Sequence, residues 1–344
     1  MAKIVLGLGL AHAPQLHTAV EDWHIRAERD RTNGVPHVYR GRLLPWQELY
    51  EERKDEGYDQ QISLEQQKEK LDASWETIGK LVEKYEEKKP DYAVLFGNDQ
   101  HEIMVDGQIQ PPFTIITSET VANMPRTEEQ LDRVRKVPGI ELSDHGHLPP
   151  EHQIYPAAPE LAQHLVAGAM ADEFDVAISS KVPKADAELT WTDGMPHAFG
   201  FIYRNIMQDK VIPHVPIAIN TFFGPNQPTA RRCLEFGKSI GRTIQAWDED
   251  ATVGLMCSGG LSHFAIDEQL DLEFLKALKE KDYDTLTGHE ESWYQSGTSE
   301  LKNWIALAGA LSVVDDIELT ISDYHAFYRT EAGTGNGSGF AFWE

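Results

Sequence analysis

Five short apolar runs are the feature of this sequence that most restricts its fold. Each run is bounded by Gly, Pro, Asn or Ser, as is typical of strands buried within a parallel sheet. The runs are Ile4–Leu10, Tyr92–Phe96, Asp175–Ser179, Pro216–Asn220 and Val253–Cys257. Strands of this kind need helices to cover the sheet, so the intervening sequence should be helical.

Helical patterns do lie between these runs. In Leu64–Lys88 the apolar residues fall on one stripe, and Pro90 follows as a stop signal. Four further stretches show the same pattern: Ala158–Ala171, Thr229–Trp247, Leu272–Lys281 and Ser299–Leu311. Alternating strands and helices predict an α/β fold with a central sheet flanked by helices. No composition break marks a boundary, so residues 1–344 are expected to form a single domain.

Three segments fit neither pattern. Glu21–Asp59 is polar, and Pro138–Pro156 is rich in Pro, Gly and His. Long segments of this kind often cover functional sites, so we interpret residues 21–59 as a covering insertion. Gly333–Gly339 is glycine-rich but lacks the strand and helix of a nucleotide-binding loop, which predicts a mobile loop before a final strand or tail at Phe340–Trp343. Residues 324–344 would then form a C-terminal wall or tail.

The charge of the chain excludes some classes of partner. Its formal net charge is −25, which repels phosphate backbones and anionic lipid, so we expect no nucleic-acid or membrane partner. Cys233 and Cys257 are too few for a disulfide framework and fit a reducing compartment. The apolar N-terminal run is too short to span a membrane and lacks a basic leader. A cytoplasmic protein is expected.

Three of the apolar runs are followed closely by a histidine. His12 comes after the first run, His101 after the second and His263 after the last. In open α/β sheets, ligands bind beyond the carboxyl ends of the strands. If these strands are parallel, the three histidines meet at one edge. Any one of them alone is more often a hydrogen-bonded loop residue, but the repetition favours a functional site.

Glu300 is a fourth candidate. It follows Ser299, a suitable N-cap, so its carboxylate could simply favour the helix dipole. It could instead complete a metal site of two histidines and one carboxylate, which suits non-haem Fe(II) that activates oxygen. Zinc accepts the same ligands in hydrolases. The residue types alone therefore leave oxygen chemistry and hydrolysis both open.

The sequence resembles the class III extradiol ring-cleavage dioxygenases over most of its length. This superfamily includes the catalytic β subunit of protocatechuate 4,5-dioxygenase, and the likeness is nearest to single-chain gallate and 3-O-methylgallate dioxygenases. The matching segments are GLAHAPQL (Gly9–Leu16), DYAVLFGNDQHE (Asp91–Glu102), DEFDVAISS (Asp172–Ser180), GLMCSGGLSH (Gly254–His263) and SGTSELKNWIALAGAL (Ser296–Leu311). SGGLSH and SGTSE with its following NW are the more specific pieces.

The resemblance implies a fold, a reaction and a set of roles. The fold is a single catalytic domain with a central mixed sheet flanked by helices. The reaction inserts both atoms of O2 into a catechol-type aromatic, such as gallate, 3-O-methylgallate or a protocatechuate-like acid, and opens the ring next to the diol. Fe(II) would be held by His12, His101 and Glu300, and His263 would act as acid and base. The single-chain relatives also suggest a homodimer.

The second histidine ligand departs from the family pattern. In the protocatechuate enzyme this histidine directly follows Asn-Asp, whereas here Gln100 intervenes before His101. Assigning His101 requires a one-residue adjustment. His145 and His147, in a histidine-containing loop, are the alternatives.

The substrate pocket is less defined by the sequence. Asp193 stands where the family has an Asp-His-Gly histidine, and His197 follows close by. We treat Asp193, His197 and Tyr324 as candidate substrate-binding residues. An aromatic acid also needs a cationic partner, and the candidates are Arg26, Arg29, Arg31, Arg40, Arg42 and Arg329.

Two other functions remain open at this point. One is a zinc- or iron-dependent hydrolase that uses the same ligands, and the other is a non-catalytic, Memo-like binding protein on the same scaffold. His263, as a proton-transfer residue, favours an enzyme over a binding protein. Oxygen dependence separates the dioxygenase from the hydrolase.

Overall fold

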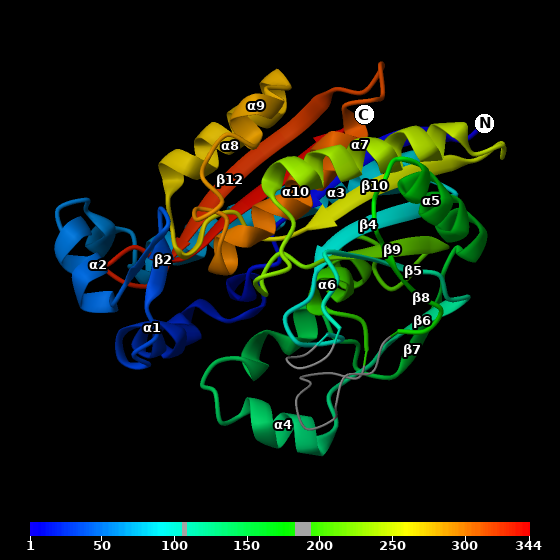
Figure 1. The fold of residues 1–344 in the computed structure, drawn as a ribbon. Coiled ribbons are helices and arrows are strands. Elements are labelled where there is room, and N and C mark those ends of the chain that lie inside the picture. Colours follow the sequence, from blue (N-terminus) through cyan, green and yellow to red (C-terminus); the bar gives the residue numbers. More distant parts are fainter. Residues whose placement is uncertain (105–108, 183–193) are drawn as a thin grey trace.

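The computed structural model describes residues 1–104, 109–182 and 194–344, and a nine-stranded sheet forms its centre (Figure 1). The strands are β1 (Lys3–Leu10), β4 (Tyr92–Asn98), β5 (Phe113–Ile116), β8 (Ala177–Ser179), β9 (His214–Ile219), β10 (Thr252–Ser258), β11 (His263–Ala265), β12 (Leu319–Tyr328) and β13 (Thr334–Trp343). Their order is β11-β13-β1-β10-β4-β9-β5-β8, and β12 pairs with β13. All five predicted strands are present.

The sheet is mixed, as expected. Its centre is parallel, because β1 pairs with β10, β10 with β4, and β4 with β9 in the same direction. On either side of this centre, β13 runs antiparallel to β1 and β5 runs antiparallel to β9. The parallel centre brings the carboxyl ends of β1, β10 and β4 to one edge.

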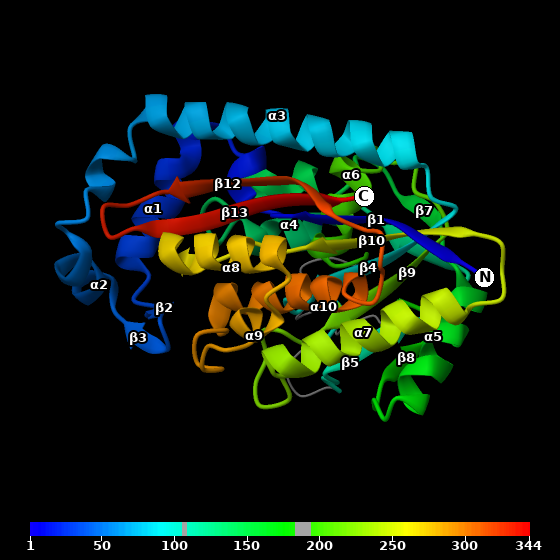
Figure 2. The same cartoon turned by 90° about the horizontal axis from the view of Figure 1, so that it is seen from above.

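Helices cover both faces of the sheet, in two layers (Figure 2). One face carries α5 (Pro159–Ala171), α7 (Ala230–Ala246), α8 (Glu268–Glu280) and α10 (Leu301–Leu311), and the other carries α3 (Leu64–Lys88) and α6 (His197–Asn205). Successive residues of a strand contribute alternately to the hydrophobic cores on the two faces of the sheet. In β4, Val94 and Phe96 enter the first core, whereas Ala93 and Leu95 enter the second. The predicted α/β class is confirmed.

The predicted helices are also confirmed, with two shifted starts. α8 begins before the predicted Leu272 because the Asp267 side chain caps it by accepting the N–H of Leu270. α10 begins after the predicted Ser299 because Ser296–Glu300 form a 3₁₀ helix (η5). Glu300 therefore lies at the junction of η5 and α10.

The prediction of a mobile loop at Gly333–Gly339 is wrong. Residues 334–339 belong to β13 (Thr334–Trp343), which is buried along its whole length and pairs with β1, β11 and β12. The glycines permit close packing that a side chain would block. A Cβ on Gly335 would lie 2.0 Å from the Phe327 carbonyl oxygen, and one on Gly337 would lie 2.1 Å from the Asp271 carboxylate.

The two polar segments contain regular structure. Residues 21–59 include α1 (Trp23–Thr32), the hairpin of β2 (His37–Tyr39) and β3 (Arg42–Leu44), and α2 (Trp46–Arg53). The other short elements are η1 (Pro14–His17), η2 (Val20–Asp22), η3 (Tyr58–Gln60), β6 (Thr120–Asn123), α4 (Glu128–Val134), η4 (Glu141–Gly146), β7 (Gln153–Pro156) and α9 (Tyr283–Leu286). Among the described residues, no helix has the length and apolar character needed to cross a membrane.

Candidate metal centre

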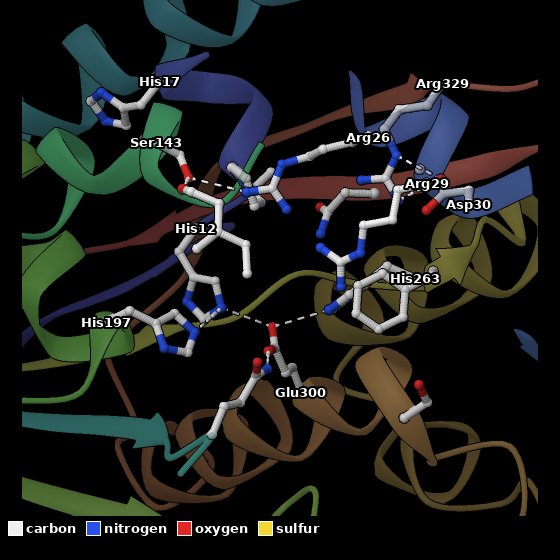
Figure 3. Close-up of a pocket in the computed structure, with 18 of the residues that line it drawn as sticks. His12, His17, Arg26, Arg29, Asp30, Ser143, His197, His263, Glu300 and Arg329 are labelled. Atoms are coloured by element: carbon white, nitrogen blue, oxygen red, sulfur yellow. Dashed lines mark hydrogen bonds and ion pairs between the residues drawn. The ribbon is translucent and has the colours of Figure 1, made fainter. Parts of the chain in front are cut away.

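The site lies at the carboxyl edge of the parallel strands, where the sequence predicted it. His12 follows β1, and Asn98 ends β4. Ser258 ends β10 and is followed by the loop that leads to His263. Glu300 approaches the same edge from the start of α10. Figure 3 shows the side chains of His12, His197, His263 and Glu300 turned toward one another.

Three side chains form a group suited to a metal ion: His12, His197 and Glu300. His12 Nε2 lies 3.0 Å from Glu300 Oε2 and 3.2 Å from His197 Nε2. Two donors that each lie about 2.1 Å from one ion, at right angles, would be about 3.0 Å apart. The observed separations therefore fit adjacent ligand positions on a single ion.

Each of the two histidines is anchored through its other ring nitrogen. His12 Nδ1 lies 2.7 Å from the Ser258 hydroxyl, and His197 Nδ1 lies 2.5 Å from Glu102 Oε1. The backbone N–H of His197 also donates to Glu102. Such outer partners fix the ring orientation of a metal-binding histidine and leave Nε2 to face the ion.

Glu300 is fully buried and receives hydrogen bonds on both oxygens. Oε1 accepts from the side-chain amides of Asn98, at 3.1 Å, and Gln100, at 2.9 Å. Oε2 accepts the Gly260 N–H at 2.7 Å. Burial alone would raise the pKa of this carboxyl, but His12 and His263 outweigh it and hold the pKa well below its usual range. Glu300 is thus a fixed anion.

Glycines allow close packing between the segments SGGLSH and SGTSE. A Cβ on Gly297 would lie 2.1 Å from the His263 ring, and one on Gly259 would lie 3.1 Å from the Glu300 Cβ. The start of α10 then ties the strand ends together, because Asn303 Nδ2 donates to Asn98 and to the Ser258 carbonyl. The segments SGGLSH and SGTSE therefore form one structural unit.

His263 lies beside this group with a defined orientation. Its Nδ1 is 2.9 Å from the Leu261 carbonyl oxygen, which can only accept, so Nδ1 carries a proton. Its Nε2 faces the site, 3.6 Å from Glu300 Oε2. The structure therefore brings His12, Glu300 and His263 together, and leaves the Nε2 lone pair of a neutral His263 available for a proton.

His101 does not join the group, in contrast to the sequence interpretation. Its backbone has a φ of 65°, and its ring stacks on Phe223 with the centroids 3.8 Å apart. The alternatives His145 and His147 are not members either. His145 packs edge-on against His17, and the His147 ring centroid is 6.1 Å from that of His197. Of the candidate histidines, His197 takes the place beside His12.

The three candidate substrate-binding residues have different positions in the structure. Asp193 lies outside the described residues. Tyr324 is directed into the protein, where its hydroxyl donates to Asp271 Oδ2 at 2.7 Å, and it does not line the cavity at the metal centre. That interpretation is corrected because β12 turns this side chain toward α8. His197 is close enough to line the site but belongs to the metal group itself.

A cavity of about 450 Å³ opens onto the group. Phe201, Phe222 and Phe264 contribute aromatic side chains to its walls. Residues 21–59 supply part of the lining, including Arg26 and Arg29 of α1. The space is adequate for a small aromatic ligand held against the metal centre.

Several supporting residues were not identified from the sequence. Four residues hydrogen-bond the metal group and so fix its position: Ser258, Glu102, Asn98 and Gln100. Each of them ends or follows a strand that the sequence had predicted. Their position at the carboxyl ends of β4 and β10 is the sequence feature that could have identified them. His197 carries a weaker signal, as the first residue of a helix after Pro196.

Comparisons with known proteins identify the family of this chain. Residues 61–333 match the family described as the catalytic LigB subunit of aromatic ring-opening dioxygenase. The chain is also similar to the gallate dioxygenase of Pseudomonas putida, with 26% identity over 172 residues. That alignment covers 44% of this chain and 45% of the relative, so it spans less than half the length of either protein. The chain belongs to the LigB family of aromatic ring-opening dioxygenases.

Proposed function

We propose that this protein is an Fe(II)-dependent extradiol dioxygenase that inserts both atoms of O2 into a catechol-type aromatic and opens the ring next to the diol. The observation that carries the proposal is the group of His12, His197 and Glu300, with His263 directly beside it. Two histidines and one carboxylate, with open positions, suit non-haem iron that activates oxygen. The family membership supports ring opening over hydrolysis.

The protein's own residues would have separate tasks. Iron held by His12, His197 and Glu300 would supply Lewis-acid and oxygen-activating chemistry and would lower the pKa of the substrate hydroxyls. Phe201, Phe222 and Phe264 would keep the ring in place and exclude water. His263 Nε2 would accept a hydroxyl proton and later return it to an oxygen atom of the reacting substrate.

A reconstitution experiment tests the proposal. The full chain is loaded anaerobically with Fe(II) and then given oxygen with gallate, 3-O-methylgallate, protocatechuate or catechol. We expect oxygen uptake and the chromophore of a ring-opened product with at least one of them. Turnover that continues without oxygen would indicate a hydrolase. Bound iron without any turnover across this series would contradict the proposal and favour a binding protein.

A further inference from the structure

The cavity at the metal centre has an unusual charge balance for so acidic a protein. Its lining contains four arginines and four carboxylates, although the chain as a whole carries a formal net charge of −25. Glu300 and Glu102 belong to the metal centre, where Glu102 holds His197. Two carboxylates are thus left to balance the four arginines.

Those two carboxylates already have arginine partners. Asp30 accepts from Arg329 at 2.9 Å and also from the Thr334 hydroxyl. Asp144 accepts from Nε and Nη2 of Arg126, at 2.7 and 2.8 Å. Arg329 and Arg126 are therefore compensated within the protein.

Arg26 and Arg29 make no ion pair or hydrogen bond with a carboxylate among the described residues. Within the described ranges, Arg26 donates only to the neutral Ser143 hydroxyl, at 3.3 Å, and its Nε is buried without an acceptor. The Arg29 guanidinium makes no hydrogen bond or ion pair with any described residue. Burial, together with the nearby Arg329 and Arg29, lowers the pKa of Arg26 from 12.5 to about 9, although Asp30 and Asp144 act in the opposite direction. The carboxylates near them, Asp30 and Asp144, are bonded to Arg329 and Arg126 instead. Two partly buried cations that share their counter-charges in this way are costly unless a ligand supplies another.

The two arginines face the same space. They are three residues apart on α1, so they lie on one side of the helix, and both line the cavity. Figure 3 shows Arg26 extending toward Ser143 and Arg29 extending toward the side of the cavity that holds His263. An anionic group on a ligand at the metal centre could reach them from within the cavity.

We propose that Arg26 and Arg29 bind a carboxylate on the aromatic substrate, so that α1 selects acids over neutral catechols. This inference rests on the proposed function and assigns the substrate's charge to two residues of the N-terminal segment. Guanidinium groups match a carboxylate in shape as well as in charge. The remaining arginine candidates of the sequence do not serve this purpose, because they pair elsewhere: Arg31 with Glu331, Arg40 with Asp267 and Arg42 with Glu52.

The kinetic test compares 3,4-dihydroxybenzoate with its neutral amide, 3,4-dihydroxybenzamide. We expect Arg29→Met and Arg26→Met each to lower kcat/KM for the acid by about 10- to 100-fold, the usual range for a charged hydrogen bond, with little effect on the amide. Arg29→Lys should keep part of the preference. Arg31→Met is the matched control, since Arg31 lies on the same helix but outside the cavity, and it should change neither value.

A binding measurement separates this inference from the proposed reaction. The Fe(II)-loaded chain is titrated with both compounds by calorimetry without oxygen, so that no turnover is needed. Tighter binding of the acid than of the amide, lost in Arg29→Met and Arg26→Met, would support the anion site even if no ring opening were found. Equal binding of acid and amide by the unaltered protein, or a preference that survives both substitutions, would overturn it.

Thermal unfolding shows whether the arginines have a structural role instead. An arginine that stabilises the fold through an ion pair lowers the unfolding midpoint when it is removed. Arg29 forms no ion pair with any residue that the structure describes, so Arg29→Met should leave the midpoint unchanged or raise it. A lower midpoint, together with an unchanged preference for the acid, would assign Arg29 to folding and contradict the proposal.

Discussion

At the scale of single residues, ring orientation decides which histidine joins the metal group. His101 and His197 are both close in sequence to recognised motifs, and His197 has a carboxylate on its outer nitrogen, from Glu102, with its Nε2 facing His12. His101 is held by its stacking on Phe223. Glu102 itself belongs to the motif that suggested His101, so the motif contributes to the site through its glutamate.

Iron content tests this assignment. His197→Ala and Glu300→Ala should each lose most of their iron after anaerobic loading and desalting, because each removes a ligand from the proposed set. His101→Ala is the matched comparison and should retain iron near the level of the unaltered chain. The amount of iron per chain is measured by a colorimetric chelator assay. Loss of iron from His101→Ala but not from His197→Ala would restore the original interpretation.

Removal of His263 should affect the chemistry more than the metal. His263→Ala should lower kcat by about 10²- to 10⁴-fold, the usual scale for general acid–base catalysis, and should keep its iron. His145→Ala serves as the control because His145 is exposed and lies outside the cavity lining. Steady-state oxygen uptake and iron content are measured on the same samples. If His263→Ala lost iron as completely as Glu300→Ala, His263 would be a ligand.

At the scale of elements, close helix packing places Glu300. α7 and α10 meet along glycines that bring their backbones together, since a Cβ on Gly237 would lie 2.0 Å from the Ala306 carbonyl oxygen, and one on Gly309 would lie 2.2 Å from that of Leu234. With α10 held in this position, Asn303 and Trp304 can bond the ends of β4 and β10. The start of the helix then presents Glu300 to the histidines.

A pair of glycine substitutions tests the importance of this packing. Gly237→Ala should lower the free energy of unfolding by about 1–3 kcal/mol or more, because its Cβ would meet the rigid backbone of α10. Gly79→Ala, on the exposed side of α3 with open space around it, should raise that free energy by up to about 1 kcal/mol. Both are measured by urea unfolding. Equal effects in the two variants would mean that helix propensity outweighs the contact.

At the scale of the whole molecule, the sheet joins the two ends of the chain at the site. β1 lies between β10 and β13, so the first and last strands are neighbours. β13 also supplies Asn336 to the cavity, and Arg329, after β12, fixes Asp30 of α1. The N-terminal segment is thereby tied to the C-terminal strands over the metal centre.

Acid should destabilise this molecule partly through His214, which is fully buried in β9. Burial lowers its pKa from 6.5 to about 4, so the folded protein keeps it neutral while the unfolded chain takes up a proton. The stability that depends on neutral His214 is therefore present above about pH 6.5 and is lost as pH falls toward about 4. The full loss corresponds to about 3 kcal/mol.

His214→Gln removes this contribution. The free energy of unfolding of the variant should fall less steeply between pH 6.5 and pH 4 than that of the unaltered protein, as measured by urea unfolding across the range. His24→Gln is the control, since His24 is exposed, and should keep the original slope. An identical slope in His214→Gln would show that other groups account for the acid sensitivity.

The sequence by itself determined the α/β class, the principal helices and the strands whose carboxyl ends carry the site. The runs followed by histidines, which depend on local burial, also placed His12 and His263 at one edge, together with His101, and the family resemblance added Glu300 to them. Tertiary structure alone decided three points: the position of His197, rather than His101, beside His12; the burial of the glycine-rich β13; and the lack of an ion pair for Arg26 and Arg29 among the described residues. These depend on contacts between residues far apart in the chain, such as Glu102 with His197 and Asp30 with Arg329, which local patterns do not encode.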